Sequence, residues 1–158
     1  MAEFRAACAL FPTGVTVVTR RLHDDRAYGM TVSSFTSVSL EPPLVLVCID
    51  KRAGFLSGLR GGVRFAINVL REDQEKIAVR FSRPPESNRF SGIESFEIED
   101  IPVLAGTVAI FVCTLQQLIE AGDHFVLIGE VDSIERYPGR ALVWCESAYH
   151  CLPPPHAD

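Results

Sequence analysis

The residues with the clearest capacity for ligand chemistry lie in the segment from Tyr28 to Asp50. Three hydroxyl side chains, Thr31, Ser33 and Ser34, follow a glycine and run into an apolar strand. Alternation across this stretch predicts a continuous strand with no purely apolar face. Small hydroxyls along a strand edge offer hydrogen bonds to a polar ligand that lies flat against the backbone. An ordinary Ser/Thr-rich edge strand has the same composition, so residue types leave both interpretations open.

Other side chains suited to binding or catalysis occur singly. His124 follows Gly122-Asp123 where a strand is expected to start, so its side chain can project into a cleft, although a lone histidine is usually structural. Asn68 lies among apolar residues and must be hydrogen-bonded if it is buried, which favours a structural bond. The basic pairs Arg20-Arg21 and Lys51-Arg52 are typical of solvated strand ends.

Composition excludes several classes of protein. A chain of 158 residues that is 47% hydrophobic and 22% charged is an ordinary globular domain, large enough to bury a core. Its net charge of −5 argues against a broad nucleic-acid interface. The longest apolar run, Leu44 to Ile49, is too short to span a membrane, and we expect no membrane association.

The cysteines indicate a reducing environment. They are five in number and show no C-x-x-C spacing, which predicts neither a disulfide framework nor a metal site. Cys48 and Cys113 lie in apolar runs and are expected to be inert core residues. No signal-peptide pattern is visible, since Glu3 and Arg5 interrupt the start, and a cytoplasmic location is the simplest expectation.

Patterning predicts a mainly β chain with a few short helices. Helical spacing is expected over Glu3–Leu10, Ala53–Leu59 and Glu72–Phe81. Besides the long strand, further strands are expected at Val15–Arg20, Leu44–Ile49, Val63–Leu70, Glu94–Glu99, Val103–Leu118, Phe125–Ile134 and Ala141–Cys145. A polar turn is expected at 23–26, a turn between the two long strands at 121–123, a mobile loop at 83–87 and an extended tail at 153–158. Many strands with short connections predict a barrel.

Five segments, in order along the chain, resemble those of the flavin reductase family. They are Phe11-Pro-Thr-Gly-Val-Thr-Val-Val-Thr19, the segment 28–50, Phe65-Ala-Ile-Asn-Val-Leu-Arg-Glu-Asp-Gln74, Asn88-Arg-Phe-Ser-Gly92 and Glu120-Ala-Gly-Asp-His-Phe-Val-Leu-Ile-Gly-Glu-Val131. The resemblance covers about residues 4–150. It implies one flavin reductase-like domain over 1–158, with 151–158 as a C-terminal tail, folded as an FMN-binding split β-barrel.

The resemblance also implies a set of flavin contacts. The backbone from Met30 to Ser34 would meet the edge of the isoalloxazine ring, and Lys51 with Arg52 would neutralise phosphate. Relatives often have Ser, Thr or Asn where this chain has Ala53-Gly-Phe55, although Gly54 still presents a backbone N–H. The expected cofactor-binding residues are Met30, Thr31, Val32, Ser33, Ser34, Thr36, Ser37, Asp50, Lys51, Arg52, Ala53, Asn68, Arg89, Phe90 and Tyr149.

The implied function is NAD(P)H:flavin oxidoreductase, with FMN or FAD as cofactor or substrate and a partner monooxygenase that receives reduced flavin. His124 would lie beside the nicotinamide and act as the catalytic residue, and a homodimer would complete the cleft. No metal is implied, because the flavin itself carries the chemistry. Two alternatives remain open: a non-catalytic flavin-binding carrier or sensor, and a flavin-dependent oxidase of the same fold.

Overall fold

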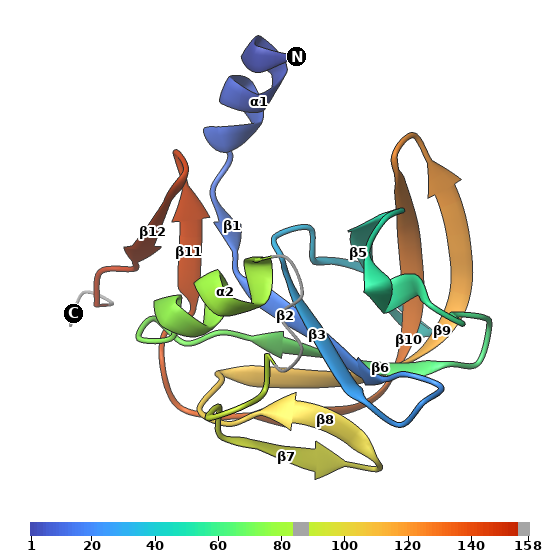
Figure 1. The fold of residues 1–158 in the computed structure, drawn as a ribbon. Helices are drawn as coiled ribbons and strands as arrows, with labels where there is room; N and C mark the ends of the chain where they lie inside the picture. The colour runs from blue at the N-terminus through green and yellow to red at the C-terminus, as the bar shows by residue number, and fades with distance from the viewer. Residues whose placement is uncertain (84–88, 155–158) are drawn as a thin grey trace.

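Strands dominate the architecture. The computed structural model describes residues 1–83 and 89–154, so most of the loop expected at 83–87 and the last part of the tail lie outside the described residues. The helices of the described part are short: α1 spans Ala2–Ala9, α2 spans Glu75–Ser82, and η1 is a 3-10 turn over Gly54–Leu56 (Figure 1). The expectation of a mainly β chain with a few short helices is confirmed.

The main sheet is antiparallel, and its two edge strands are neighbours in the sequence. Its strands follow the order β3 (Ala27–Val32), β2 (Thr16–Arg21), β6 (Arg64–Val69), β9 (Ala109–Ala121), β10 (His124–Arg136), β5 (Pro43–Asp50) and β4 (Thr36–Leu40). The outermost strands, β3 and β4, are consecutive in the chain, yet no ladder joins them within the described residues. The sheet is therefore a split barrel, and the chain crosses the split between Val32 and Thr36.

Two smaller sheets complete the fold. In the first, β1 (Thr13–Gly14) and β12 (Ala148–Cys151) flank β11 (Leu142–Cys145); in the second, β7 (Ser95–Ile98) pairs with β8 (Ile101–Leu104). Helix α1 projects from the body above β11 and β12 (Figure 1), and the Glu146 N–H donates to the Ala9 carbonyl at 2.6 Å.

Two predicted strands are each broken in the structure. The strand expected through the segment 28–40 is interrupted at 33–35, so the two faces expected there do not exist as continuous surfaces. The strand expected over Val103–Leu118 is two strands, β8 and β9, because the chain turns at Gly106, where φ is +73°. The short strand β12, by contrast, had not been expected, and α2 begins at Glu75 rather than Glu72.

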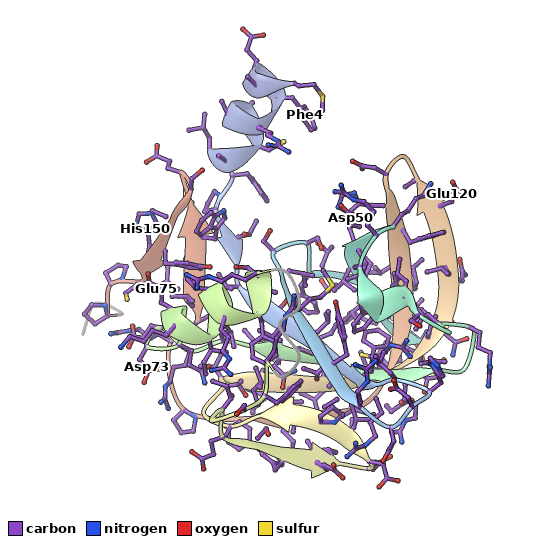
Figure 2. All side chains as sticks on the ribbon, in the orientation of Figure 1. Phe4, Asp50, Asp73, Glu75, Glu120 and His150 are labelled. Atoms are coloured by element: carbon purple, nitrogen blue, oxygen red, sulfur yellow. The ribbon has the colours of Figure 1, made fainter. Side chains whose placement is uncertain are left out.

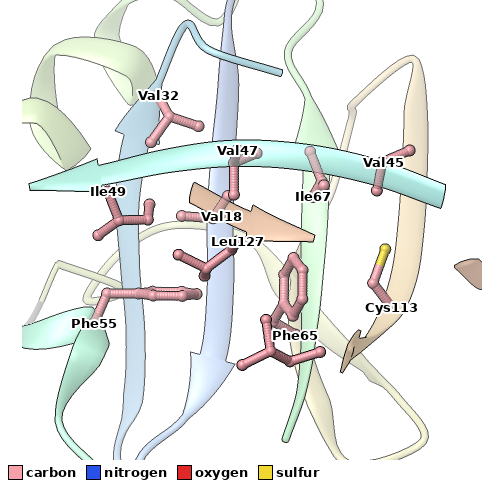
Figure 3. Close-up of a cluster of buried hydrophobic side chains, with 11 residues drawn as sticks. Val18, Val32, Val45, Val47, Ile49, Phe55, Phe65, Ile67, Cys113 and Leu127 are labelled. Atoms are coloured by element: carbon pink, nitrogen blue, oxygen red, sulfur yellow. The ribbon is translucent and has the colours of Figure 1, made fainter. Parts of the chain in front are cut away.

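The principal core lies between β5 and the strands that face it across the barrel. Alternate residues of β5, namely Val45, Val47 and Ile49, point inward and pack with the buried rings of Phe55 and Phe65 (Figure 3). A second cluster lies under α2, around Phe81, Leu70 and Leu142.

Over residues 1–83 and 89–154, no helix has the length and apolar character needed to cross a bilayer.

Candidate functional site

The hydroxyl-rich segment lies at the split of the barrel, and two of its hydroxyls hold the structure together. Ser34 Oγ accepts a hydrogen bond from Cys48 N–H at 2.8 Å and donates to the Cys48 carbonyl at 3.3 Å. These bonds fasten the crossing segment to β5 where strand pairing is missing. Thr31 Oγ1 donates to the Ala78 carbonyl at 2.7 Å, which fastens β3 to α2. The side chains of Ser33, Thr36 and Ser37 remain exposed.

The two edge strands of the sheet, β3 and β4, have backbone groups without a strand partner close to these exposed hydroxyls. Within the described residues, β3 has a strand partner only on its β2 side and β4 only on its β5 side. Unpaired N–H and C=O groups on such edges must find partners in water or in a ligand. Met30 is half-buried and Val32 is buried against the core, so both contribute backbone and apolar surface at this place.

A second group of expected residues gathers where β5 ends and β10 begins. Asp50 lies opposite His124 in the β5–β10 register. Arg52 donates to the Asp50 carboxylate from Nε at 3.0 Å and from Nη2 at 2.7 Å, and this pair holds the pKa of Asp50 well below its usual range. His124 Nδ1 lies 2.7 Å from Asp123 Oδ1, which lowers the pKa of Asp123.

Both cations expected at a phosphate are already paired. Lys51 forms an ion pair with Glu120, and its ammonium lies 5.5 Å from the centre of the Phe125 ring. Figure 2 shows Asp50 and Glu120 near each other at the exposed end of the β9–β10 hairpin. The expectation of a solvated end is confirmed for Arg52, which is exposed, whereas Lys51 is half-buried. A phosphate here would have to displace the exposed Glu120 carboxylate from Lys51 and the half-buried Asp50 carboxylate from Arg52.

Arg89 contacts strand β3, and Phe90 contacts helix α2. Arg89 donates from Nη1 to the Gly29 carbonyl at 2.5 Å, and its guanidinium lies 5.5 Å from the centre of the Tyr28 ring. Its Nε is buried and has no acceptor among the described residues. Phe90 packs edge-on against Phe81 with ring centres 5.2 Å apart, so it fixes its loop to α2.

Two expected site residues have structural surroundings instead. Asn68 is fully buried, and its amide donates to the Val17 carbonyl at 2.9 Å and to Thr19 Oγ1 at 3.0 Å while accepting from Leu104 N–H at 2.8 Å. Tyr149 packs edge-on against Trp144, 4.7 Å between ring centres, and burial raises the pKa of its phenol. The hydrogen bonds of Asn68 and the ring contact of Tyr149 do not involve the segment 30–37 at the split.

Arg20 was expected at a solvated strand end, and this expectation was wrong. Its side chain turns inward, and only 2% of the residue is exposed. Nε donates to the Phe55 carbonyl at 2.8 Å, and burial lowers the pKa of the guanidinium. Sequence alone offered no signal for this burial, because Arg20 directly precedes Arg21, which is half-exposed and pairs with Glu97.

The fold and these groups define a small split-barrel protein whose split is bordered by unpaired strand edges and exposed hydroxyls. The comparison of residues 8–153 with known families gives a match to the flavin reductase like domain, and the chain belongs to that family. The resemblance inferred from the sequence is thereby confirmed.

Individual relatives extend this comparison. The NADH-dependent FAD reductase of Streptomyces globisporus is 45% identical over 143 residues, covering 87% of this chain and 78% of the relative. The reductase subunit HsaB of a flavin-dependent monooxygenase from Mycobacterium tuberculosis is 36% identical over 155 residues, covering 96% and 82%. The chain spans only 63% and 47% of the length of two curated relatives from Rhizobium meliloti.

A solved structure agrees with the fold. The NADH:FAD oxidoreductase SgcE6 of Streptomyces globisporus C-1027, in complex with NAD and FAD fragments, superposes with a TM-score of 0.90 at 37% identity. The alignment covers 97% of this chain and 93% of that one. The split barrel described above is therefore the architecture of a known flavin reductase.

Proposed function

We propose that this protein is an NAD(P)H:flavin oxidoreductase that reduces FMN, FAD or riboflavin. The observation that carries the proposal is the position of Met30–Ser37 at the split of the barrel, in a chain that belongs to the flavin reductase-like family. A flavin supplies a ring that accepts hydride from a reduced nicotinamide, so the protein's task is to bind and align the two rings.

The chain's own groups are arranged for that task. Free backbone groups on the edges of β3 and β4 suit the N–H and carbonyl groups of an isoalloxazine edge, and Ser33, Thr36 and Ser37 can bond the ribityl chain. Arg89 Nε, which is buried without an acceptor in the described chain, suits a flavin oxygen. Phosphate binding by Lys51 and Arg52 requires exchange of Glu120 and Asp50 for the phosphate.

His124 is the side chain that we assign to the nicotinamide. It stands at the first residue of β10, directly after Gly122 at φ +59° and Asp123, and its side chain is 43% exposed. A hydrogen bond from its ring to the carboxamide would orient the hydride donor over the flavin. The hydrogen bond with Asp123 orients the ring, since the carboxylate binds Nδ1 and leaves Nε2 for the ligand.

We further propose a homodimer, in which a second copy covers α1 and the two residues after it. No residue of α1 is buried, and Phe4 in the helix and Leu10 and Phe11 directly after it are 71%, 64% and 73% exposed. Figure 2 shows Phe4 standing clear of the body. An isolated helix of this length is marginal in water. A second copy of the chain would bury these side chains, and light scattering should give a mass of twice 17.4 kDa.

A partner monooxygenase and a cytoplasmic location complete the proposal. The partner is supported by the name of the HsaB relative, a reductase subunit. The location is supported by the cysteines, all of which are free thiols, as is usual in a reducing compartment.

The test is steady-state oxidation of NADH and NADPH with FMN, FAD or riboflavin added in turn. We expect nicotinamide oxidation that depends on added flavin, with reduced flavin as product. Tight flavin binding without nicotinamide oxidation would refute the reductase assignment in favour of a carrier or sensor. Turnover of an organic substrate by the isolated chain, with oxygen as acceptor, would favour an oxidase.

A further inference from the structure

A buried arginine supports the segment that follows β5. Besides the bond from Nε to the Phe55 carbonyl, Arg20 donates from Nη2 to the Ser57 carbonyl and places its guanidinium 5.4 Å from the centre of the Phe55 ring. Within the described residues its hydrogen bonds all go to backbone carbonyls, and no carboxylate pairs with it. A buried cation without a counter-charge is costly, so these carbonyls and this ring are what keep it in place.

The contacts continue from Phe55 across β3. The Phe55 ring meets the ring of Tyr28 edge-on, with centres 6.3 Å apart and planes at 65°. Tyr28 also approaches the backbone of Gly54 so closely that a β-carbon there would lie 3.0 Å from Cε2. On the other side, the guanidinium of Arg89 lies over the Tyr28 ring. Arg20, Phe55, Tyr28 and Arg89 thus form a row in which two aromatic rings lie between two guanidinium groups.

This row connects two parts of the site that are distant in sequence. One end fixes Gly54–Ser57, which follows the Lys51-Arg52 pair after a single residue, and the other end holds Arg89, whose Nη1 also binds the Gly29 carbonyl. Tyr28 is the only residue of the row, within the described chain, that contacts both loops. The Tyr28 ring is therefore a direct side-chain link between the two loops.

We propose that Tyr28 and Arg20 are positioning residues that set the spacing of the two flavin-binding loops. Arg20 acts from inside the barrel by fixing Phe55, and Tyr28 transmits that position to Arg89. The inference rests on the proposed flavin binding, because it assigns the row a purpose at that site. Neither residue needs to touch the flavin for this role.

The experiment is a double-mutant cycle on flavin affinity in the full chain. Arg20→Met and Arg89→Met are made singly and together, in the wild-type and in a Tyr28→Leu background, and FAD and FMN binding is followed by quenching of flavin fluorescence. Residues without shared partners usually give additive effects. We expect each single change to weaken binding about five- to tenfold, and the double change to weaken it clearly less than the product.

Amide hydrogen exchange on the flavin-free protein supplies a readout independent of activity. Arg20→Met should speed exchange at Gly54–Ser57 and also at Arg89–Gly92, and Tyr28→Leu should abolish the second effect. Tyr28→Phe keeps the ring and should behave as wild type. Arg26→Met, which removes an exposed cation paired with Asp24, is the control expected to change neither loop.

Three results would contradict the role proposed for Arg20 and Tyr28 or the flavin binding on which it rests. Additive effects in the cycle, or faster exchange confined to Gly54–Ser57, would show that Arg20 merely stabilises its own neighbours, and the inference would fail. If Arg20→Met does not fold, Tyr28→Leu alone still tests the link, since it leaves the hydrogen bonds of Arg20 in place. Failure of the wild-type protein to bind any flavin would overturn the proposed function instead.

Discussion

Replacing Asn68 with alanine separates a structural role from a ligand-binding one at a residue that the resemblance places near the flavin. The side chain is fully buried in β6, and its hydrogen bonds reach Val17 in β2 and Leu104 in β8. We expect Asn68→Ala to lower the free energy of unfolding strongly while leaving flavin affinity per folded molecule nearly unchanged.

The expected magnitude follows from the bonds lost. Each net hydrogen bond contributes about 0.5–1.5 kcal/mol, and a buried donor left without an acceptor costs about 1–3 kcal/mol. The amide makes bonds to Val17, Thr19 and Leu104, and its removal strands the Leu104 N–H. A total loss of about 4 kcal/mol corresponds to a fall in Tm of roughly 8–16 °C for a chain of this size.

The assay pairs a thermal melt with a flavin titration on the same sample. Ser33→Ala is the matched control, because that hydroxyl is exposed in the flavin segment; it should leave Tm within about 2 °C and weaken flavin binding. Unchanged stability of Asn68→Ala together with a large loss of flavin affinity would refute the structural account and return Asn68 to the binding site.

Three further outcomes are expected. His124→Ala should slow NADH-driven reduction of bound flavin about tenfold in stopped flow, the effect of one oriented hydrogen bond, with Tm and flavin affinity nearly intact; a large fall in Tm at an unchanged rate would instead make His124 structural. Replacing both Lys51 and Arg52 with alanine should weaken FMN about tenfold more than riboflavin, and equal losses would place the phosphate elsewhere. Burial raises the pKa of the Cys113 thiol to about 12, so iodoacetamide at pH 8 should label the exposed Cys8 and Cys151 but spare Cys113, as mass spectrometry can check. Because the unfolded chain loses this proton from about pH 8.5 upward while the folded chain keeps it, stability from this group is present below that pH and is lost as pH rises towards 12.

Local patterns were sufficient to predict much of the fold. The hairpin of β9 and β10 around Gly122 was expected, since alternating apolar residues flank a glycine that the turn needs at positive φ. The break at Gly106 was not, because the residues on both sides of it, in β8 and β9, have the composition of strands. Strand β12 depends on pairing with β11, and a four-residue strand carries too few side chains to show a period.

For the candidate site, the hydroxyl-rich segment could be recognised in the sequence, but the partners of its side chains could not. The segment from Met30 to Ser37 does lie at the split, yet the partners of Ser34 and Thr31 are 14 and 47 residues away in sequence. Whether a hydroxyl binds a ligand or a neighbouring carbonyl depends on such distant contacts. The same reason explains why Arg20 was mistaken for a solvated residue, since its acceptors lie 35 and 37 residues further along the chain.

The pairing of β1 with β11 has a consequence for synthesis on the ribosome. Thr13 of β1 is synthesised well before its register partner, Trp144 of β11. The arm formed by residues 13–15 therefore stays uncovered until β11 has been made, although Val15 is buried in one cluster with Leu142 in the folded chain. Contacts of such sequence separation slow folding. A chain stalled or cut before Leu142 would expose this arm permanently, and we expect such fragments to be bound by chaperones or degraded.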